Sequence, residues 1–195
     1  IPVRAFRLGF VGELSFELHM PSSYMLSVWN MLLEAGKPLG IMPFGLEAQN
    51  CLRLEKGHVI IGQESEIRTT LHDLGMGWLW YRNKPEARTV GAVALAMTEH
   101  QEGRLKLVGL RMQVPGKCPK DGAVIEDAGA VRGFVCTARY SFTLKESIGL
   151  ALVEAPLAEP GTIVKLYEPG AGDERIKAAV VKPPFYDPEG SRLKM

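Results

Sequence analysis

The chain has 195 residues, of which 46% are hydrophobic and 23% are charged, and its formal net charge is +1. Such a chain can bury a substantial core, and a net charge so close to zero argues against binding nucleic acid or an anionic membrane through bulk electrostatics. No apolar run reaches the roughly 18 residues of a membrane-spanning helix, no secretion signal is evident, and the three cysteines form no CxxC pair. We therefore expect a cytoplasmic protein with reduced thiols and no membrane or nucleic-acid partner.

The first clear element is a strand from Leu14 to Met20, where apolar and polar residues alternate with the period of a half-buried strand. Glu17 lies on its polar face, and Gly9 and Gly12 precede it. The chain already begins in strand-like sequence, IPVRAFRLGF, which we interpret as a sign that it belongs to a longer protein.

Two helices are predicted next. Residues 22–36 place apolar side chains at helical spacing, with a serine suited to cap the start and Gly36 to end the helix. The second runs from about Pro43 to Lys56, because proline suits a first helical turn and Gly57 suits a C-terminal cap.

Two short apolar runs, residues 58–64 and 75–81, are then interpreted as strands. A charged link from about Asn83 to Gln101 follows, with a short helix near residues 91–97.

The last part of the chain contains short strand-like segments separated by Gly, Pro and Asp, namely RLKLVGLRMQV, AVRGFVCTARYS, IGLALVE, GTIVKLYE and RIKAAVVKPPF. This spacing predicts an all-β module, either a small barrel or a sandwich. The predicted fold class is therefore α+β, with a mixed domain at residues 1–95 and a β-rich domain at residues 96–195.

Common catalytic motifs are absent from the sequence: it has no GxSxG, Walker loop, HExxH or GxGxxG before a helix. The four histidines do not have metal-ligand spacing. We assign no catalytic residue and no metal site from pattern.

Glu17 allows two interpretations. It can be a solvated residue on a strand face, which general considerations favour. Alternatively, it can be a half-buried carboxylate that accepts paired N–H groups from an amidine-like ring edge, with Phe10 as an apolar wall for that ring.

A resemblance favours the second interpretation. GFVGELSFEL resembles the GYTGEDGFEI signature of the glycine cleavage T-protein, a tetrahydrofolate-dependent aminomethyltransferase. PFGLEAQNCLRLEKGHVIIGQESE, GMGW and VRGFVCTARYSFTLKESIGLALVE are similar to further segments of that family, in the same order. The resemblance implies a folate-binding α/β portion followed by a small C-terminal β-barrel.

Within the family, EAQNCLRLEKGH and the closing KPPFYDPEGSR resemble the folate-binding region of the sarcosine oxidase α subunit and dimethylglycine dehydrogenase. In that branch a flavin site oxidises an N-methyl amine, so flavoprotein subunits or a flavin domain are implied partners. Folate and a small amine-derived one-carbon donor are the implied ligands, and the implied product is 5,10-methylenetetrahydrofolate.

The resemblance also suggests site residues. Glu17 matches the glutamate that binds the pterin edge, and Phe10 matches a tyrosine that packs near the folate. Arg53, in LRLEKG, is the same residue as in the family. We expect its main role to be structural, and a contact with the ligand is the second expectation. Tyr186 lies in the C-terminal segment that approaches the folate site. Gln49 replaces an arginine, which places any folate contact of that charge in doubt.

The family's acidic residue that assists one-carbon transfer would precede residue 1, so we do not expect catalysis from these residues alone. Two alternatives to a transferase remain open: a non-catalytic folate-binding module and a purely structural subunit-assembly module. The cysteine-centred signature of the iron–sulfur assembly relatives is not matched, because His58 stands at the cysteine position.

Overall fold

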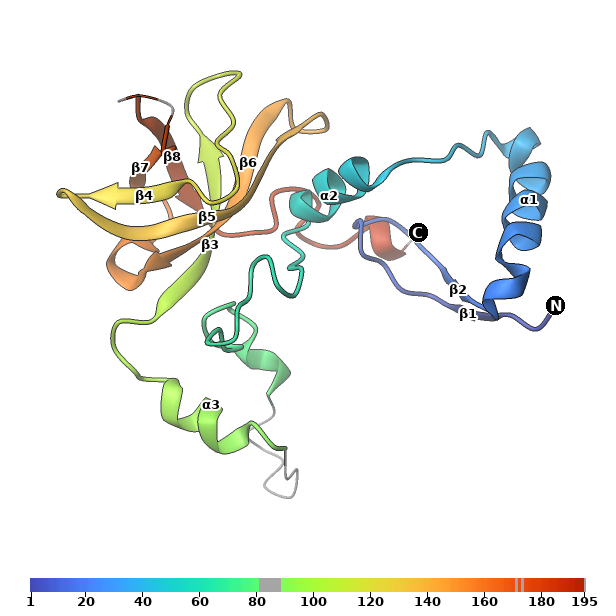
Figure 1. The fold of residues 1–195 in the computed structure, drawn as a ribbon, viewed down its shortest axis with the longest axis horizontal. Helices are drawn as coiled ribbons and strands as arrows, with labels where there is room; N and C mark the ends of the chain where they lie inside the picture. Colours follow the sequence, from blue (N-terminus) through green and yellow to red (C-terminus); the bar gives the residue numbers. More distant parts are fainter. Residues whose placement is uncertain (81–88, 171, 173, 195) are drawn as a thin grey trace.

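The C-terminal part of the protein is a closed antiparallel barrel with strand order β3-β6-β5-β4-β7-β8 (Figure 1). The computed structural model describes residues 1–80, 89–170, 172 and 174–194. The barrel strands are β3 (Leu105–Met112), β4 (Val124–Asp127), β5 (Ala130–Ser141), β6 (Glu146–Glu154), β7 (Ile163–Tyr167) and β8 (Ile176–Val181). The predicted α+β class with a small barrel is therefore confirmed, and the barrel is favoured over the sandwich.

The position of strand β6 between two cores explains why its sequence is a continuous apolar run. Ala151 and Val153 belong to the core inside the barrel, whereas Ile148 and Leu150 belong to a second core on its outside. A strand that is covered on both faces needs apolar residues at successive positions rather than alternating ones. The outer core exists because helix α2 packs there.

Helix α2 (Leu46–Glu55) joins the barrel to the N-terminal part of the chain. Leu54 is fully buried in the outer core, and the Ser141 hydroxyl of β5 donates to the Glu55 carboxylate at 2.6 Å. The predicted helix is confirmed, and its buried residues are Arg53, Leu54 and Glu55 in its last turn.

The N-terminal part consists of a small ribbon and one helix. Strands β1 (Arg4–Phe6) and β2 (Glu17–His19) pair antiparallel, and a 3₁₀ turn at Ser22–Tyr24 leads into α1 (Met25–Gly36). The predicted strand is shorter than expected, and the predicted helix is confirmed. In Figure 1, α2 lies between the barrel and this N-terminal part.

The segment between α2 and the barrel differs from the prediction. The predicted strand at residues 58–64 is wrong: residues 62–64 form a turn flanked by an isolated bridge between Ile61 and Ser65, and the Ile60 N–H donates to the Glu64 carboxylate at 2.7 Å. Residues 77–79 form a 3₁₀ turn, so the predicted strand at 75–81 is wrong over its described residues; residue 81 lies outside them.

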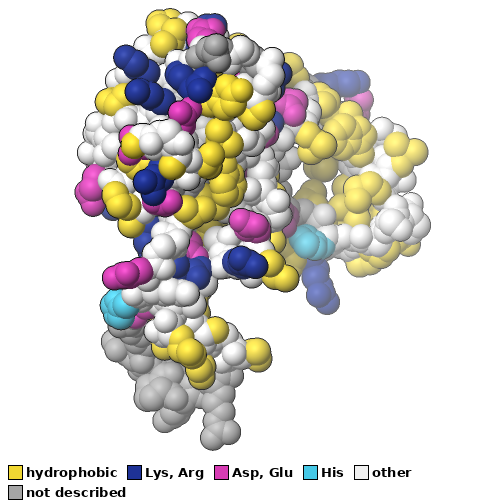
Figure 2. Space-filling model, turned by 60° about the vertical axis from the view of Figure 1, so that its left-hand side comes forward, with side chains coloured by type: hydrophobic (Ala, Val, Ile, Leu, Met, Phe, Trp, Pro, Cys, Tyr) yellow, Lys and Arg dark blue, Asp and Glu magenta, His cyan; other side chains and the backbone are white. Residues whose placement is uncertain are grey.

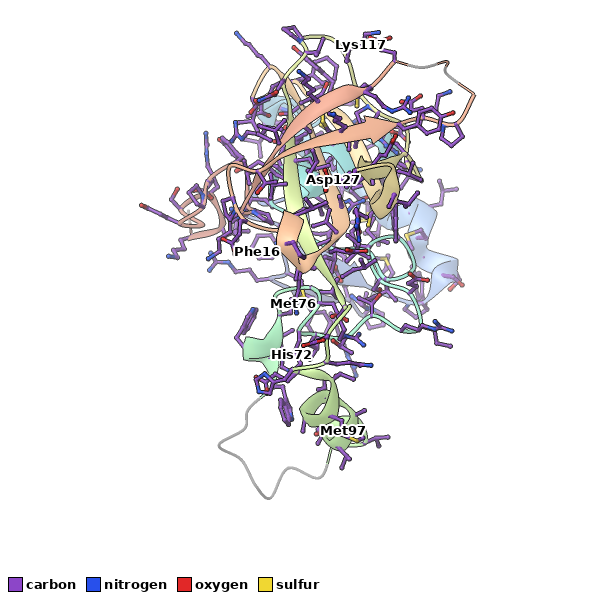
Figure 3. All side chains as sticks on the ribbon, turned by 90° about the vertical axis from the view of Figure 1, so that its left-hand side faces the viewer. Phe16, His72, Met76, Met97, Lys117 and Asp127 are labelled. Carbon is purple, nitrogen blue, oxygen red and sulfur yellow. The ribbon has the colours of Figure 1, made fainter. Side chains whose placement is uncertain are left out.

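Helix α3 (Ala92–Thr98) confirms the short helix predicted near residues 91–97. The first part of the expected link, residues 83–88, lies outside the described residues. Figure 3 shows His72, Met76 and Met97 on the arm that carries α3, away from Asp127 on the barrel. Among the described residues, no helix is both long and apolar enough to cross a membrane.

Candidate functional site

Glu17 lies at the start of β2, where its side chain is 55% exposed. Its carboxylate is 3.2 Å from the Nε2 atom of His19, on the same strand face. An open hollow of about 430 Å³ borders this carboxylate, lined by Glu17, Leu18, His19, Met20 and Met25. The hollow thus combines one carboxylate and one imidazole with the apolar side chains of Leu18, Met20 and Met25.

Phe10 occupies a different position, in the loop between β1 and β2. Its ring stacks on the His58 ring with centroids 6.0 Å apart, and His58 Nδ1 is 2.7 Å from the Phe10 carbonyl oxygen. Because a carbonyl oxygen only accepts hydrogen bonds, Nδ1 carries the proton. His58 therefore fixes both the backbone and the ring of Phe10, a contact that sequence reasoning did not identify.

Arg53 is fully buried at the C-terminal end of α2. Its Nη1 atom lies 2.8 Å from a carboxylate oxygen of Glu64, which is also fully buried. The guanidinium donates further hydrogen bonds to the His58 carbonyl at 2.9 Å and to the Gln63 side chain at 3.1 Å. These contacts hold the turn after α2 and, through His58, the Phe10 loop.

Lys56 ties the same loop to the C-terminal segment. Its ammonium group is 3.2 Å from the Asp187 carboxylate, with both side chains nearly buried. Gly12 lies over the Lys56 side chain: it has a φ of +86°, and a Cβ there would be 2.0 Å from Lys56 Cγ. Only glycine allows both this backbone conformation and this close approach.

Tyr186 belongs to this C-terminal segment. Its backbone N–H donates to the Glu55 carbonyl at 3.0 Å, which holds the segment against the end of α2. A hydrogen bond to the Tyr186 side chain raises the pKa of Arg192. Further along, the Arg7 guanidinium donates to the Leu193 carbonyl at 2.9 Å, so the segment also contacts the N-terminal part.

The structure therefore brings three of the four predicted site residues, Phe10, Arg53 and Tyr186, to one junction around the end of α2. Glu17 borders a separate hollow, whose lining residues come from β2, from Met20 directly after it and from the start of α1. Within the described part of the chain, no group of three His, Cys, Asp or Glu side chains could hold a metal ion.

The comparisons with known proteins agree with this architecture. The sequence model of the GCVT N-terminal domain matches residues 1–84, and that of the glycine cleavage T-protein C-terminal barrel domain matches residues 106–187. Among curated relatives, the chain is 35% identical over 179 residues to an aminomethyltransferase of Halothermothrix orenii and 36% identical over 180 residues to one of a Geobacillus species. Each alignment covers 92% of this chain and 48% of the relative.

A solved structure supports the same fold. The glycine cleavage system aminomethyltransferase T from Bartonella henselae matches with a TM-score of 0.84 and 25% identity, over 94% of this chain and 49% of that one. The protein is thus of the class in which an α/β portion packs through one helix on a closed C-terminal barrel. It belongs to the glycine cleavage T-protein family, and it spans about half the length of the curated relatives that it matches.

Proposed function

We propose that this chain provides a folate-binding wall and the C-terminal barrel of an enzyme that transfers a one-carbon unit from an amine donor to tetrahydrofolate, giving 5,10-methylenetetrahydrofolate. The observation that carries the proposal is the match of both T-protein domain models, which together cover most of the chain. Domains at residues 1–95 and 96–195 are part of the same proposal.

The hollow beside Glu17 supports the proposed ligand. Its volume of about 430 Å³ lies within the range of small-molecule sites, and its lining is mainly apolar apart from Glu17 and His19. A carboxylate can accept two N–H groups from the edge of a pterin, and such charge-assisted pairs are stronger than neutral ones. The 55% exposure of Glu17 leaves its carboxylate accessible to an incoming ring.

Phe10 and Tyr186 are proposed to contribute to the folate site from the junction at the end of α2. For Arg53 the contacts support a structural role, because its guanidinium forms an ion pair with Glu64 and donates hydrogen bonds to His58 and Gln63 within the chain. We propose that Arg53 shapes the junction and does not contact the ligand.

A finer proposal places the parent enzyme near the sarcosine oxidase α subunit and dimethylglycine dehydrogenase, with flavoprotein subunits or a flavin domain as partners. It is supported by the segments LRLEKGH and KPPFYDPEGSR. The alternative is a non-catalytic folate-binding or subunit-assembly module, which is favoured by the pairing of exposed Glu17 with its own neighbour His19.

Calorimetric titration with folinic acid tests the proposal on the complete gene product that contains these residues. Replacing Glu17 with Ala is expected to weaken binding by roughly 10- to 100-fold, because the pterin edge loses a charge-assisted pair of hydrogen bonds. Glu159→Ala, which removes an exposed carboxylate of the barrel part, serves as the matched control and should bind normally. Equal binding of folinic acid by the wild type and Glu17→Ala would show that Glu17 does not anchor the pterin. Absence of binding by the wild type would favour the subunit-assembly module.

A further inference from the structure

Glu17 and His19 lie on one face of strand β2 and border the same hollow. They are two positions apart, and side chains at alternate positions of a strand lie on the same face. Both line the hollow of about 430 Å³, and His19 Nε2 is 3.2 Å from a carboxylate oxygen of Glu17. A ligand that binds the Glu17 carboxylate in this hollow therefore lies beside the imidazole of His19.

The imidazole of His19 offers a hydrogen-bond donor to the hollow. An ionised carboxylate only accepts hydrogen bonds, so the contact with Glu17 places a proton on Nε2. The Phe6 ring of β1 packs against the His19 ring with a centroid distance of 5.0 Å and an interplanar angle of 73°. Phe6 thus supports the imidazole from the neighbouring strand, while Nε2 faces Glu17.

The other described residues that line the hollow are apolar. They are Leu18, Met20 and Met25, and none of them carries an N–H or O–H group in its side chain. Figure 2 shows hydrophobic side chains over much of the surface of the lobe on the right, which belongs to this N-terminal part. The side chains of the hollow therefore offer a ligand one carboxylate acceptor, one imidazole donor and apolar surface.

This arrangement of polar groups has a specific chemical complement. A matching ligand edge presents two N–H groups to the carboxylate and, next to them, an oxygen that accepts from the imidazole N–H. The edge of a 2-amino-4-oxopteridine has these groups in sequence: the 2-amino group, N3–H and the 4-oxo oxygen. In a 4-aminopteridine an amino group replaces the oxygen, so the match with the imidazole donor is lost.

We propose that His19 is a second pterin-binding residue, whose Nε2–H donates to the 4-oxo oxygen while Glu17 accepts from the 2-amino group and N3–H. The proposal rests on the proposed folate function and adds to it a residue that determines which pteridines bind. Glu17 keeps the proton on Nε2, so an amino group at the 4-position would meet a second donor. A site of this kind favours the 4-oxo ligand and disfavours the 4-amino ligand.

The contact between His19 and Glu17 does not block this role. Their side chains are 58% and 55% exposed, and an exposed ion pair of this kind is weak. An ionised carboxylate has about four lone-pair sites, so Glu17 can accept two ligand N–H groups with His19 still beside it. The Nε2–H is then shared between the Glu17 carboxylate and the ligand oxygen.

Calorimetric titration of the complete gene product with two matched ligands tests the proposal. The ligands are folinic acid and its 4-amino-4-deoxy analogue. His19→Phe keeps an aromatic ring against Phe6 and removes the donor. It should weaken binding of folinic acid by roughly 5- to 10-fold, which corresponds to one hydrogen bond, and should not weaken binding of the 4-amino analogue.

Two further variants serve as rescue and control. His19→Gln places an amide N–H near the Nε2 position and should retain most of the preference for folinic acid. His100→Phe changes a side chain that is 88% exposed and does not line the hollow, so it should leave the binding of both ligands unchanged. Exchange of the α1 and β6 amides reports in every variant whether both parts of the chain are folded.

The proposal is overturned if His19→Phe weakens the binding of both ligands equally, because His19 would then only support the strand. It is also overturned if His19→Phe leaves the binding of folinic acid unchanged. In both cases the folate function stands as long as Glu17→Ala weakens binding in the same titration. If the wild type does not bind folinic acid, or if Glu17→Ala binds it equally well, the folate site at this hollow is wrong and the role of His19 is refuted with it.

Discussion

Arg53 and Glu64 form an ion pair of 2.8 Å in which both side chains are fully buried. The pair connects the last turn of α2 to the turn at residues 60–64, and the Arg53 guanidinium also holds the His58 carbonyl. Each of two charges that are buried away from solvent is stabilised by the other, so removing one leaves the other uncompensated.

Removing one member of this pair should therefore be costly. Glu64→Gln leaves a buried guanidinium without its counter-charge and is expected to lower the free energy of unfolding by about 3–5 kcal/mol. Urea denaturation measures this change. As a control, Glu154→Gln breaks the partly exposed pair between Arg132 and Glu154, where we expect a loss of about 0–1 kcal/mol. Similar losses for the two variants would show that the burial of the Arg53 pair does not matter.

Gly12 offers a test of the contact that holds the Phe10 loop. Gly12→Ala combines a positive φ with a clash against Lys56, while Gly122→Ala has the same φ of +86° and no atom within 4 Å of the new Cβ. We expect Gly12→Ala to destabilise the protein by about 1–3 kcal/mol more than Gly122→Ala, because only the former displaces packed atoms. Thermal unfolding of the two variants gives the comparison, and equal effects would mean that the loop moves aside without cost.

Asp187 should make the attachment of the C-terminal segment sensitive to acid. The Ser191 hydroxyl, with the Arg192 N–H and Lys56, lowers the pKa of the Asp187 carboxyl in the folded state. A lowered pKa means that the stabilisation is present above the unfolded value of about 3.9 and is lost as pH falls through the folded pKa. Hydrogen exchange of residues 189–194 should therefore accelerate, relative to the barrel, as pH falls below about 4.

Asp187→Asn is the control for this acid effect. It removes the titrating group, so residues 189–194 should exchange rapidly at neutral pH already, with no further loosening in acid relative to the barrel. A local measurement is needed because hydrogen bonds from Arg104 also lower the pKa of Asp73, against the opposing effect of burial. Unchanged pH dependence in the variant would assign the effect to another carboxylate.

His58 is expected to position Phe10. His58→Ala removes both the ring contact and the hydrogen bond to the Phe10 carbonyl, whereas His58→Asn keeps a donor near the Nδ1 position. Amide exchange in residues 9–13 should accelerate by roughly tenfold in His58→Ala, about the worth of one lost hydrogen bond, and by less in His58→Asn. His100→Ala, on an exposed side chain, is the control. Equal exchange in all three variants would show that His58 does not fix the loop.

Five of the six barrel strands were predictable because they are apolar segments bounded by Gly, Pro and Asp. β4 was not predicted: its four residues, VIED, are too few and too polar at one end to show a period. The run at residues 58–64 has the composition of a buried strand, yet Ile61 is largely exposed and Glu64 is the buried residue. Its conformation follows from the ion pair with Arg53, a contact that a local sequence pattern does not reveal.

In the candidate site, too, local sequence pattern predicted some features, and contacts between distant residues determine the others. Alternation predicted a polar face for Glu17, which is exposed, but Phe16 on the predicted apolar face is 61% exposed as well. The resemblance supplied the proposed role of Glu17. The clustering of Phe10, Arg53 and Tyr186 depends on the C-terminal segment returning to α2, through contacts between residues more than 130 positions apart. Sequence spacing carries no information about that return, so the parts played by His58 and Asp187 were missed.

The most direct test of the folate proposal is a crystal structure of the complete gene product with folinic acid. We predict that the pterin edge lies in the hollow beside β2, with two ring N–H groups about 3 Å from the Glu17 carboxylate oxygens. A pterin bound elsewhere, with Glu17 still paired to His19 and facing solvent, would contradict the proposal.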